Sequence, residues 1–476
     1  MGAVRALPPC RLHRADHRVR RTSGLLSTYH LELAWLGGET AVPDVLVEVD
    51  GDRIVTVTPG VAAPDGAVRL AGLTLPGLAN AHSHAFHRAL RGRTQAGVGS
   101  FWTWREQMYA LADRLDPDSY HSLARAVYGE MAMAGITCVG EFHYLHHGAR
   151  GHPYADPNAM GAALVAAADE AGVRITLLDT CYLHGGIHHD GTGIEPDPTQ
   201  RRFSDGSAQA WTTRASAAAD LVSPTARMGA AIHSVRAVDP DSIATVASWA
   251  DERGAPLHAH VSEQPAENHQ SVTAWALTPT ELLDERGALS DRFTAVHATH
   301  LTDHDIRLLG LNRSTVCMCV TTERDLADGI GPAARLAEAG ARLSLGSDSH
   351  AVIDLLEEAR GVELDERLAS NLRGTLGAPA LLRAATDDGH RSIGWPDAGR
   401  IQDGALADLV TITLDSVRTA GTLPQHALEA VVFAATAADV RHVVSSGRVV
   451  VSDGVHRSVD VAAELGRCIR AVGEPT

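Results

Sequence analysis

The sequence predicts an α/β protein in which a (β/α)8 TIM-like barrel carries a small β-sandwich domain built from both chain ends. Three observations predict it: strands alternate with helical stretches through the middle, both ends are rich in short strands, and polar residues gather where the middle strands end. Alternation of strands and helices is typical of a parallel sheet. We expect residues 28–75 and 400–476 to form the sandwich and residues 76–399 to form the barrel.

The two chain ends resemble each other and differ from the middle. Short alternating segments lie on either side of Asp50-Gly51, a typical hairpin turn, and strand-like segments return at 404–410 and 443–451. The first stretch, residues 1–27, is rich in arginine and has no hydrophobic periodicity. We expect it to be a disordered extension outside the fold.

Eight apolar segments of the middle region are predicted strands. They cover residues 77–82, 136–144, 173–183, 228–235, 255–262, 293–300, 314–320 and 341–349. Eight such units fit a closed barrel better than an open doubly wound sheet. In a barrel, the carboxyl ends of the strands open onto one face, where active sites are built.

Composition excludes several classes of protein. The 476 residues carry 41 basic and 58 acidic side chains, a net charge of −17, and every basic residue is arginine. That balance argues against nucleic acid or a membrane as a partner. Without lysine, no carboxylated lysine can bridge two metals, which favours a single metal ion. The six cysteines form no C-x-x-C pair, as expected of reduced thiols in a cytoplasmic protein.

Histidines and an aspartate stand at the ends of predicted strands. His82 and His84 close the first strand, and residues at i and i+2 point to the same side. His260, His297 and Asp348 end the fifth, sixth and eighth strands. Imidazole and carboxylate ligands suit zinc or iron(II). The sequence therefore predicts a metal site at this face of the barrel.

The motifs that contain these residues resemble the metal-dependent amidohydrolase superfamily, in its mononuclear deaminase branch. They are PGLANAHSHAF, HAHVSEQ, VHATH and GSDSH, and the resemblance runs from about Tyr29 to the C-terminus. Within that superfamily, HSHAFHRAL, SFWTWREQMY, EFHYLHH and AIHSVRAV resemble deiminases of histidine degradation. The resemblance implies a hydrolase that converts N-formimidoyl-L-glutamate to N-formyl-L-glutamate and ammonia. It also implies a homodimer.

The resemblance implies a role for each matching residue. The ligands of one Zn2+ per chain, with Fe2+ as the alternative, would be His82, His84, His260 and Asp348. Among the catalytic residues, Glu263 would protonate the departing nitrogen, His297 would orient the attacking water and Asp348 would accept its proton. The substrate-binding residues would be His87, Arg105, Tyr144, His233 and Arg236.

The substrate implied by the resemblance is a small amidine with two carboxylates. Arginine has a planar fork that suits carboxylates, so Arg105 and Arg236 fit such a substrate. His87 departs from the family pattern, which has glutamine there, although it keeps a hydrogen-bond donor and acceptor. His258 forms an H-x-H pair with His260, and we expect it to be a core histidine.

Two other functions are compatible with the sequence. The same enzyme class could act on an aminoheterocycle such as guanine, although such a substrate favours aromatic stacking and aromatic residues make up only 4% of the chain. A barrel that has lost catalysis could serve as a binding protein, although the full ligand set and Glu263 argue against this.

Overall fold

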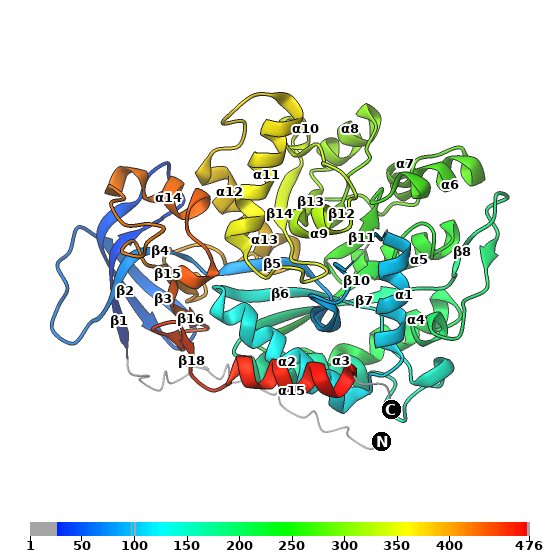
Figure 1. The fold of residues 1–476 in the computed structure, drawn as a ribbon, viewed down its shortest axis with the longest axis horizontal. Coiled ribbons are helices and arrows are strands. Elements are labelled where there is room, and N and C mark those ends of the chain that lie inside the picture. Colours follow the sequence, from blue (N-terminus) through cyan, green and yellow to red (C-terminus); the bar gives the residue numbers. More distant parts are fainter. Residues whose placement is uncertain (1–25, 97, 100, 474–476) are drawn as a thin grey trace, which may run out of the picture.

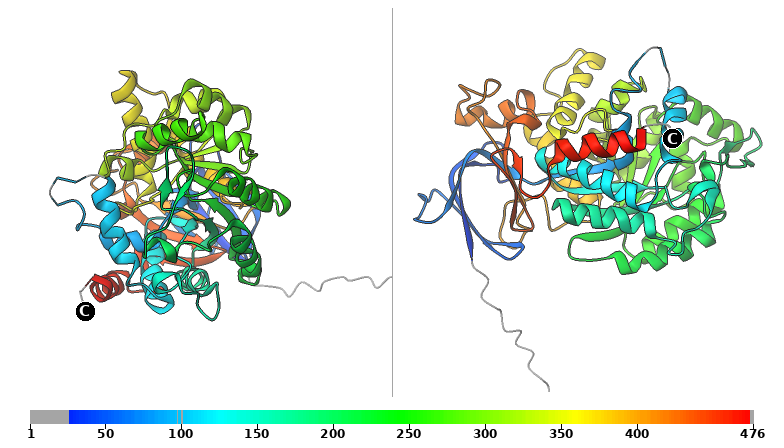
Figure 2. Two further views of the ribbon diagram at one scale, coloured as in Figure 1. Left: turned by 90° about the vertical axis from the view of Figure 1, so that its right-hand side faces the viewer. Right: turned by 60° about the horizontal axis from the view of Figure 1, so that its bottom comes forward.

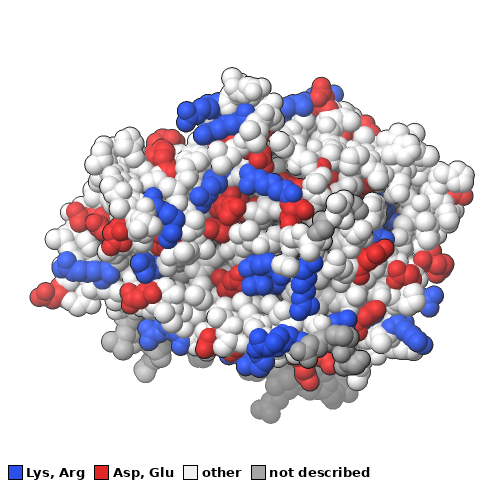
Figure 3. All heavy atoms as spheres, viewed as in Figure 1, with Lys and Arg blue, Asp and Glu red and all other residues white. Residues whose placement is uncertain are grey.

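The computed structural model describes residues 26–96, 98–99 and 101–473. Of the extension expected at residues 1–27, residues 1–25 lie outside the described part of the chain. Figure 1 shows a barrel of strands surrounded by helices, with a smaller curved sheet at its side. Acidic and arginine side chains are interspersed over the face shown in Figure 3. Among the described helices, none combines the length and apolar character that crossing a membrane requires.

The middle region forms an eight-stranded parallel sheet, as predicted. Its strand order is β14-β13-β12-β11-β10-β7-β6-β5, so each strand pairs with its neighbour along the chain. The strands are β5 (Leu78–Ser83), β6 (Ile136–His143), β7 (Arg174–Cys181), β10 (Ala226–Ile232), β11 (Leu257–Val261), β12 (Phe293–His297), β13 (Thr315–Met318) and β14 (Arg342–Leu345). Each overlaps one of the eight predicted segments, and most are shorter than predicted.

The barrel closes where its first and last strands meet. A parallel bridge joins Ser83 to Asp348, and the Asp348 amide donates to the His82 carbonyl at 3.1 Å. Asp348 lies beyond the end of β14 at Leu345. The prediction that it ends the eighth strand is therefore wrong, because the chain leaves strand geometry and Asp348 has a φ of 39°. The closure brings Asp348 beside His82 of β5 and His84, which directly follows this strand.

Helices surround the strands, as the left view of Figure 2 shows. They are α1 (Phe101–Ala112), α2 (Pro117–Met133), α3 (Ala159–Ala171), α4 (Ala208–Ala217), α5 (Pro240–Glu252), α6 (Pro265–Trp275), α7 (Pro279–Glu285), α8 (Asp303–Leu311), α9 (Val320–Asp325), α10 (Ala333–Ala339), α11 (Leu355–Ser370), α12 (Ala378–Ala385) and α13 (Asp387–Ser392). Several of these helices begin at a residue whose side chain accepts a hydrogen bond from a backbone amide of the first turn. Asp116 before α2 and Asp239 before α5 are examples, and a proline follows each.

Short elements complete the barrel connections. They are the 3-10 turns η1 (Ala85–Leu90), η2 (Ala149–Gly151), η3 (Gln200–Arg202) and η4 (Ala218–Leu221), and the hairpin of β8 (Gly186–Ile187) and β9 (Gly193–Ile194). The turn η1 directly follows the first strand, and η3 belongs to the long connection after β7. Both connections leave the carboxyl ends of their strands, so they lie beside the expected site.

The chain ends together build one separate β-rich unit, as predicted, and its strands form a single sheet rather than the two layers of the predicted sandwich. Its order is β18-β17-β16-β15-β4-β1-β2-β3. The strands are β1 (Ser27–Ala34), β2 (Val42–Asp50), β3 (Arg53–Pro59), β4 (Val68–Pro76), β15 (Leu409–Ile412), β16 (Val440–Ser445), β17 (Arg448–Ser452) and β18 (Val455–His456). Antiparallel pairing of β4 with β15 joins the two ends of the chain. Apolar side chains from both halves, among them Leu31 and Leu409, share one core.

Helical segments of the C-terminal region extend beyond this sheet. They are η5 (Pro424–His426), α14 (Ala427–Phe433), η6 (Ala437–Asp439) and α15 (Val461–Gly473). The last helix, α15, lies along α2 of the barrel (Figures 1 and 2), and Arg125 of α2 donates to Glu464 of α15 at 2.9 Å. Leu465 and Cys468 are buried there. The C-terminal helix therefore covers the barrel rather than the sheet.

Candidate active site

The four residues predicted as metal ligands meet at the carboxyl ends of the strands. Each offers one ligand atom, and these atoms all lie within 4.8 Å of one another in a buried cluster. Nε2 of His82 is 3.1 Å from Oδ1 of Asp348 and 3.2 Å from Nε2 of His260. Nε2 of His84 is 3.4 Å from the same Asp348 oxygen. Strands β5 and β11 and the barrel closure thus bring one donor set together.

The hydrogen bonds behind two of these imidazoles fix which nitrogen faces the cluster. Nδ1–H of His84 donates to the Phe142 carbonyl at 2.9 Å, and Nδ1–H of His260 donates to the His233 carbonyl at 2.8 Å. This assignment leaves the Nε2 lone pairs of both rings directed into the cluster, as in many metal sites.

The cluster fits a divalent cation. Burial lowers the pKa of His82, His84 and His260, so these rings are neutral. Burial opposes ionisation of Asp348, but the hydrogen bond with His82 and the charge of His297 outweigh it and hold the Asp348 pKa well below its usual value. Converging lone pairs and a carboxylate repel one another unless a cation lies between them. Three imidazoles and one carboxylate are a donor set that zinc accepts.

His297 stands between carboxylates beside the cluster. Its Nε2 is 3.7 Å from Glu263 and 3.9 Å from Asp348, and its Nδ1 is 3.4 Å from Glu323. Burial opposes the charged form of His297, but these carboxylates outweigh it and raise the His297 pKa well above its usual value. For Glu263, burial raises the pKa, and the positive charge of His297 offsets part of this rise. The site thus combines a carboxyl group that can hold a proton with a charged imidazole.

Strained backbone marks the strand ends that carry these groups. His297 has a φ of 66°, Asp348 of 39° and Ser262, next to Glu263, of 51°. Residues other than glycine cost about 1–3 kcal/mol in such conformations, and they cluster at functional sites. The surrounding fold therefore holds these side chains in positions that the chain alone would not adopt.

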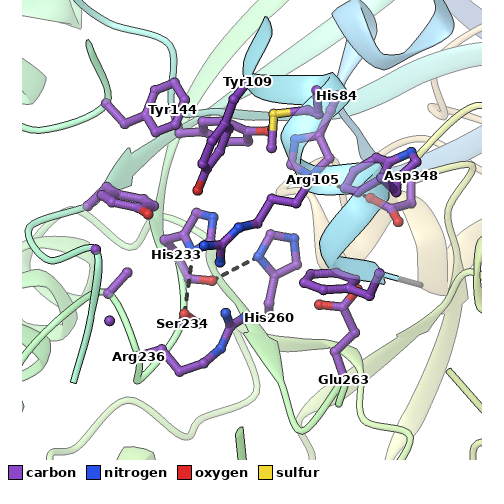
Figure 4. Close-up of a pocket in the computed structure, with 18 of the residues that line it drawn as sticks. His84, Arg105, Tyr109, Tyr144, His233, Ser234, Arg236, His260, Glu263 and Asp348 are labelled. Carbon is purple, nitrogen blue, oxygen red and sulfur yellow. Dashed lines mark hydrogen bonds and ion pairs between the residues drawn. The ribbon is translucent and has the colours of Figure 1, made fainter. Parts of the chain in front are cut away.

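A cavity opens from this cluster. All five residues predicted to bind substrate line it, together with His84, His260, Glu263, His297 and Asp348. Figure 4 shows Arg105, Tyr144, His233 and Arg236 around the same space as His84, His260, Glu263 and Asp348. His87 and Tyr144 lie on one wall, where His87 Nε2 is 3.0 Å from the Tyr144 hydroxyl. His233 and Arg236 follow β10. One cavity therefore contains both the ligand cluster and the predicted substrate-binding residues.

The two arginines of the cavity have different surroundings. The Arg105 guanidinium lies 4.9 Å from the centre of the Trp102 ring and 5.3 Å from that of Tyr109. Within the described part of the chain, no carboxylate forms an ion pair with it. The nearest carboxylate to Arg236 is that of Glu267, 3.9 Å from Nε. Both arginines keep hydrogen-bond donors for a ligand.

Several residues at the site were not predicted from the sequence. Glu323 and Asp328 lie after β13, whose end carries no polar residue, so the pattern of polar strand ends does not indicate them. Burial and the charge of Glu263 raise the Asp328 pKa to about 8. Glu267 is buried in α6, four residues after Glu263, and no spacing rule indicates it because Glu263 lies in the loop before that helix. His258 points away from the cluster, and its Nε2 lies 2.9 Å from the Ser392 carbonyl.

Comparisons with known proteins agree with this geometry. The chain is 36% identical over 442 residues to a formimidoylglutamate deiminase of Pseudomonas aeruginosa, an alignment that covers 90% of this chain and 96% of the relative. A crystal structure of an amidohydrolase from Brucella melitensis is 29% identical and superposes with a TM-score of 0.86 over 94% of this chain and 99% of that one.

A second similar solved structure contains a bound metal ion of its own. It is an adenosine deaminase from Xanthomonas campestris with bound zinc, 25% identical, with a TM-score of 0.79 over 93% of this chain and 98% of that one. The sequence profile of the Amidohydrolase family matches residues 73–450. With its parallel barrel, the donor cluster at the carboxyl ends of the strands and this match over most of its length, the chain belongs to the amidohydrolase family.

Proposed function

We propose that this chain hydrolyses N-formimidoyl-L-glutamate to N-formyl-L-glutamate and ammonia, a step of histidine degradation. One observation carries the proposal: a single cavity contains the ligand cluster and two arginines with free donors, Arg105 and Arg236. A dicarboxylate bound through these arginines presents its amidine group to the cluster. The 36% identity to a formimidoylglutamate deiminase supports the same substrate.

The ligand cluster suits a single Zn2+, with Fe2+ as the alternative. His82, His84, His260 and Asp348 would hold it. When bound, such a cation supplies a Lewis acid that lowers the pKa of water from 15.7 to about 7. Arginine binds carboxylates through paired hydrogen bonds, which fixes the orientation of the substrate. The chain therefore provides both activation of water and alignment of the amidine carbon.

Proton transfers follow from the groups around His297. A water that hydrogen-bonds to His297 Nε2 lies near both Glu263 and Asp348, which are 3.7 and 3.9 Å from that nitrogen. Asp348 accepts a proton from the water as its oxygen bonds to the amidine carbon. Glu263, whose pKa is raised by burial, gives a proton to the departing nitrogen of the protonated amidine, so that ammonia leaves. The remaining hydroxyl proton passes to Glu263 as the formyl C=O forms, and Asp348 releases the first water proton to solvent.

The test is release of ammonia from N-formimidoyl-L-glutamate by the zinc-loaded protein. We expect stoichiometric N-formyl-L-glutamate, identified by NMR, and about one zinc per chain by metal analysis. The control is Glu263→Gln, which keeps the ligand cluster and removes the proton donor. No ammonia from the unmodified, zinc-loaded protein would contradict the proposed substrate.

A second candidate is deamination of an aminoheterocycle. The likeness to an adenosine deaminase favours it, as do the rings of Trp104, Tyr144 and Phe203 on the cavity wall. Guanine and adenosine in the same ammonia assay test it directly. Arg236→Met separates the two candidates, because it removes a carboxylate partner: turnover of the dicarboxylate falls steeply, whereas turnover of a neutral heterocycle changes little.

A further inference from the structure

Three residues that the proposed reaction does not use form a hydrogen-bonded group in the cavity wall. Tyr109 lies on α1, Tyr182 follows β7, and Gln200 lies in η3. Gln200 Nε2 donates to the Tyr109 hydroxyl at 3.0 Å and to the Tyr182 hydroxyl at 2.9 Å. Both tyrosines line the cavity, and Gln200 is 3% exposed behind them. A buried amide thus links two phenols that face the ligand space.

The orientation of the Gln200 amide is set from its other side. The backbone N–H of Asp197 donates to Gln200 Oε1 at 2.9 Å, so the NH2 group must face the two phenols. Both phenol oxygens therefore act as acceptors toward Gln200, and each phenol keeps its own hydrogen to donate. The two phenols also interact with each other. A hydrogen bond between the two phenols uses only one of their two hydroxyl hydrogens. At least one hydroxyl hydrogen therefore remains for a ligand in the cavity.

The charges around these phenols favour an anion. The Arg105 guanidinium lies 5.3 Å from the centre of the Tyr109 ring, and the charges of Arg105 and Arg236 both act on Tyr182. Figure 4 shows the Tyr109 hydroxyl and the Arg105 guanidinium pointing into the same part of the cavity. Burial raises the Tyr182 pKa well above its usual value, so this phenol stays protonated and remains a donor.

The segment that carries Gln200 also holds α1 in place. The Thr199 hydroxyl donates to Asp113 at 2.7 Å, just beyond the end of α1. Arg202 donates to the carbonyls of Ala112 and Leu115. Since Arg105 and Tyr109 lie one turn apart on α1, the same contacts fix both groups relative to the barrel.

We infer that Tyr109 and Tyr182, held by Gln200, form with Arg105 a carboxylate-binding subsite that selects substrates with a second carboxylate. Gln200 is the positioning residue, because it occupies the phenol lone pairs and directs hydroxyl hydrogen toward the ligand. The inference deepens the proposed function and rests on it for the identity of the dicarboxylate. Because carboxylate binding can be measured without turnover, the two can be tested separately.

The experiment measures the Kd of glutarate, a plain dicarboxylate, for the zinc-loaded protein by calorimetry. In Tyr109→Phe/Tyr182→Phe we expect binding about 10- to 100-fold weaker, since a hydrogen bond to a charged group contributes about 1.5–3 kcal/mol. The matched control is Tyr29→Phe, which makes the same change in the buried core of the other sheet and leaves the Kd unchanged. Gln200→Glu is expected to weaken binding although both phenols remain, because its carboxylate captures their hydrogens.

Substrate analogues then identify the carboxylate involved. N-Formimidoyl-4-aminobutyrate and N-formimidoyl-2-aminobutyrate each lack one of the two carboxylates. For the analogue that lacks the carboxylate of this subsite, the double phenylalanine variant should cause no further loss of kcat/KM. For the other analogue, it should cause the same loss as for the full substrate.

The outcomes separate the two proposals. If the unmodified protein binds glutarate but releases no ammonia from N-formimidoyl-L-glutamate, the proposed function is wrong and the subsite stands. If glutarate does not bind, or binds the double phenylalanine variant as tightly as the unmodified protein, the subsite is wrong, whatever the activity.

Discussion

The two ends of the barrel satisfy their polar groups in opposite ways. At the carboxyl ends, the lone pairs of His84 and His260 converge on Asp348 and call for a cation. At the amino ends, Arg174 pairs with Asp408, both 1% exposed, and donates to the Ser446 hydroxyl at 2.5 Å. One end therefore leaves its buried groups ready for a ligand, whereas the other pairs them within the chain.

A single strand connects these two environments. β7 begins at Arg174, against the sheet built from the chain ends, and stops at Cys181, next to the cavity residue Tyr182. Asp408 and Ser446, which contact Arg174, both flank strands of the smaller sheet, so these contacts tie the amino end of the barrel to that sheet. Conserved polar groups at the two ends of such barrels commonly divide into stability and catalysis. Substitutions at the two ends should separate in the same way.

The largest expected effect is on catalysis, at the carboxyl end. Glu263→Gln removes the proton donor for the departing nitrogen while keeping its shape, and we expect kcat to fall by about 10²–10⁴. Zinc content and the free energy of unfolding should hardly change. Steady-state ammonia release, metal analysis and urea unfolding of the same preparation check this. A fall in kcat of less than threefold would show that another group protonates the leaving nitrogen.

At the amino end, the expected effect is on stability. Asp408→Ala leaves the buried Arg174 without its partner, which should cost about 3–5 kcal/mol of unfolding free energy. The kcat of the folded protein should stay unchanged, because this pair lies at the opposite end of the barrel. Urea unfolding and ammonia release measure the two quantities.

A double variant serves as the control for this prediction. Arg174→Met/Asp408→Leu replaces both charges by apolar groups, and most of the lost stability should return. If Asp408→Ala lowered kcat without changing stability, the separation between the two ends would be disproved.

The ligand cluster could be predicted because it follows simple geometric rules. The i, i+2 spacing of His82 and His84 and the polar ends of separate apolar strands indicate one face of a barrel. The composite sheet was also predictable, because both chain ends share a pattern of short strands. The register of this sheet was not predictable, because no local sequence feature indicates that Leu409 pairs with Pro76. Pairing between distant segments depends on the packing of the whole domain.

Four other residues in and around the cavity could not be predicted, because they lie in helices and connections rather than at strand ends: Tyr109, Gln200, Glu323 and Asp328. Gln200 is polar and comes from an irregular connection, where buried and exposed residues follow no period. Tyr109 lies on a helix, where its spacing equally suits an ordinary core position. Glu323 and Asp328 act on His297 and Glu263 from the connection after β13. Their roles depend on how loops from neighbouring strands pack, which a single sequence does not specify.

A smaller effect is expected when the cation is added. Metal binding to the folded cluster stabilises the protein by about 2.7 kcal/mol at a free zinc concentration 100 times the Kd. Thermal unfolding of the chelator-treated protein should therefore shift upward on adding zinc. His82→Ala should lose this shift, whereas Asp408→Ala should keep it although it starts from a lower midpoint. An undiminished shift in His82→Ala would mean that zinc binds elsewhere.

The smallest effect tests whether every polar group near the carboxyl end serves the reaction. Asp116 begins α2 on that side of the barrel and accepts from the Ser119 amide at 2.8 Å, outside the cavity. Asp116→Ala should cost about 1 kcal/mol of stability and leave kcat unchanged.

The pH dependence of this helix cap distinguishes it from a general loss of packing. Hydrogen bonds from Ser119 lower the Asp116 pKa in the folded protein, below the unfolded value of about 3.9. The carboxylate form therefore stabilises the fold above that unfolded pKa, and the contribution is lost as pH falls through the folded pKa. Asp116→Asn keeps a good cap without a titrating group, so its stability should equal that of the unmodified protein at pH 7 and exceed it at acid pH. The stability of Asp116→Asn should be compared with that of the unmodified protein at pH 7 and at pH 3. If the difference is the same at both pH values, Asp116 does not act through its charged form.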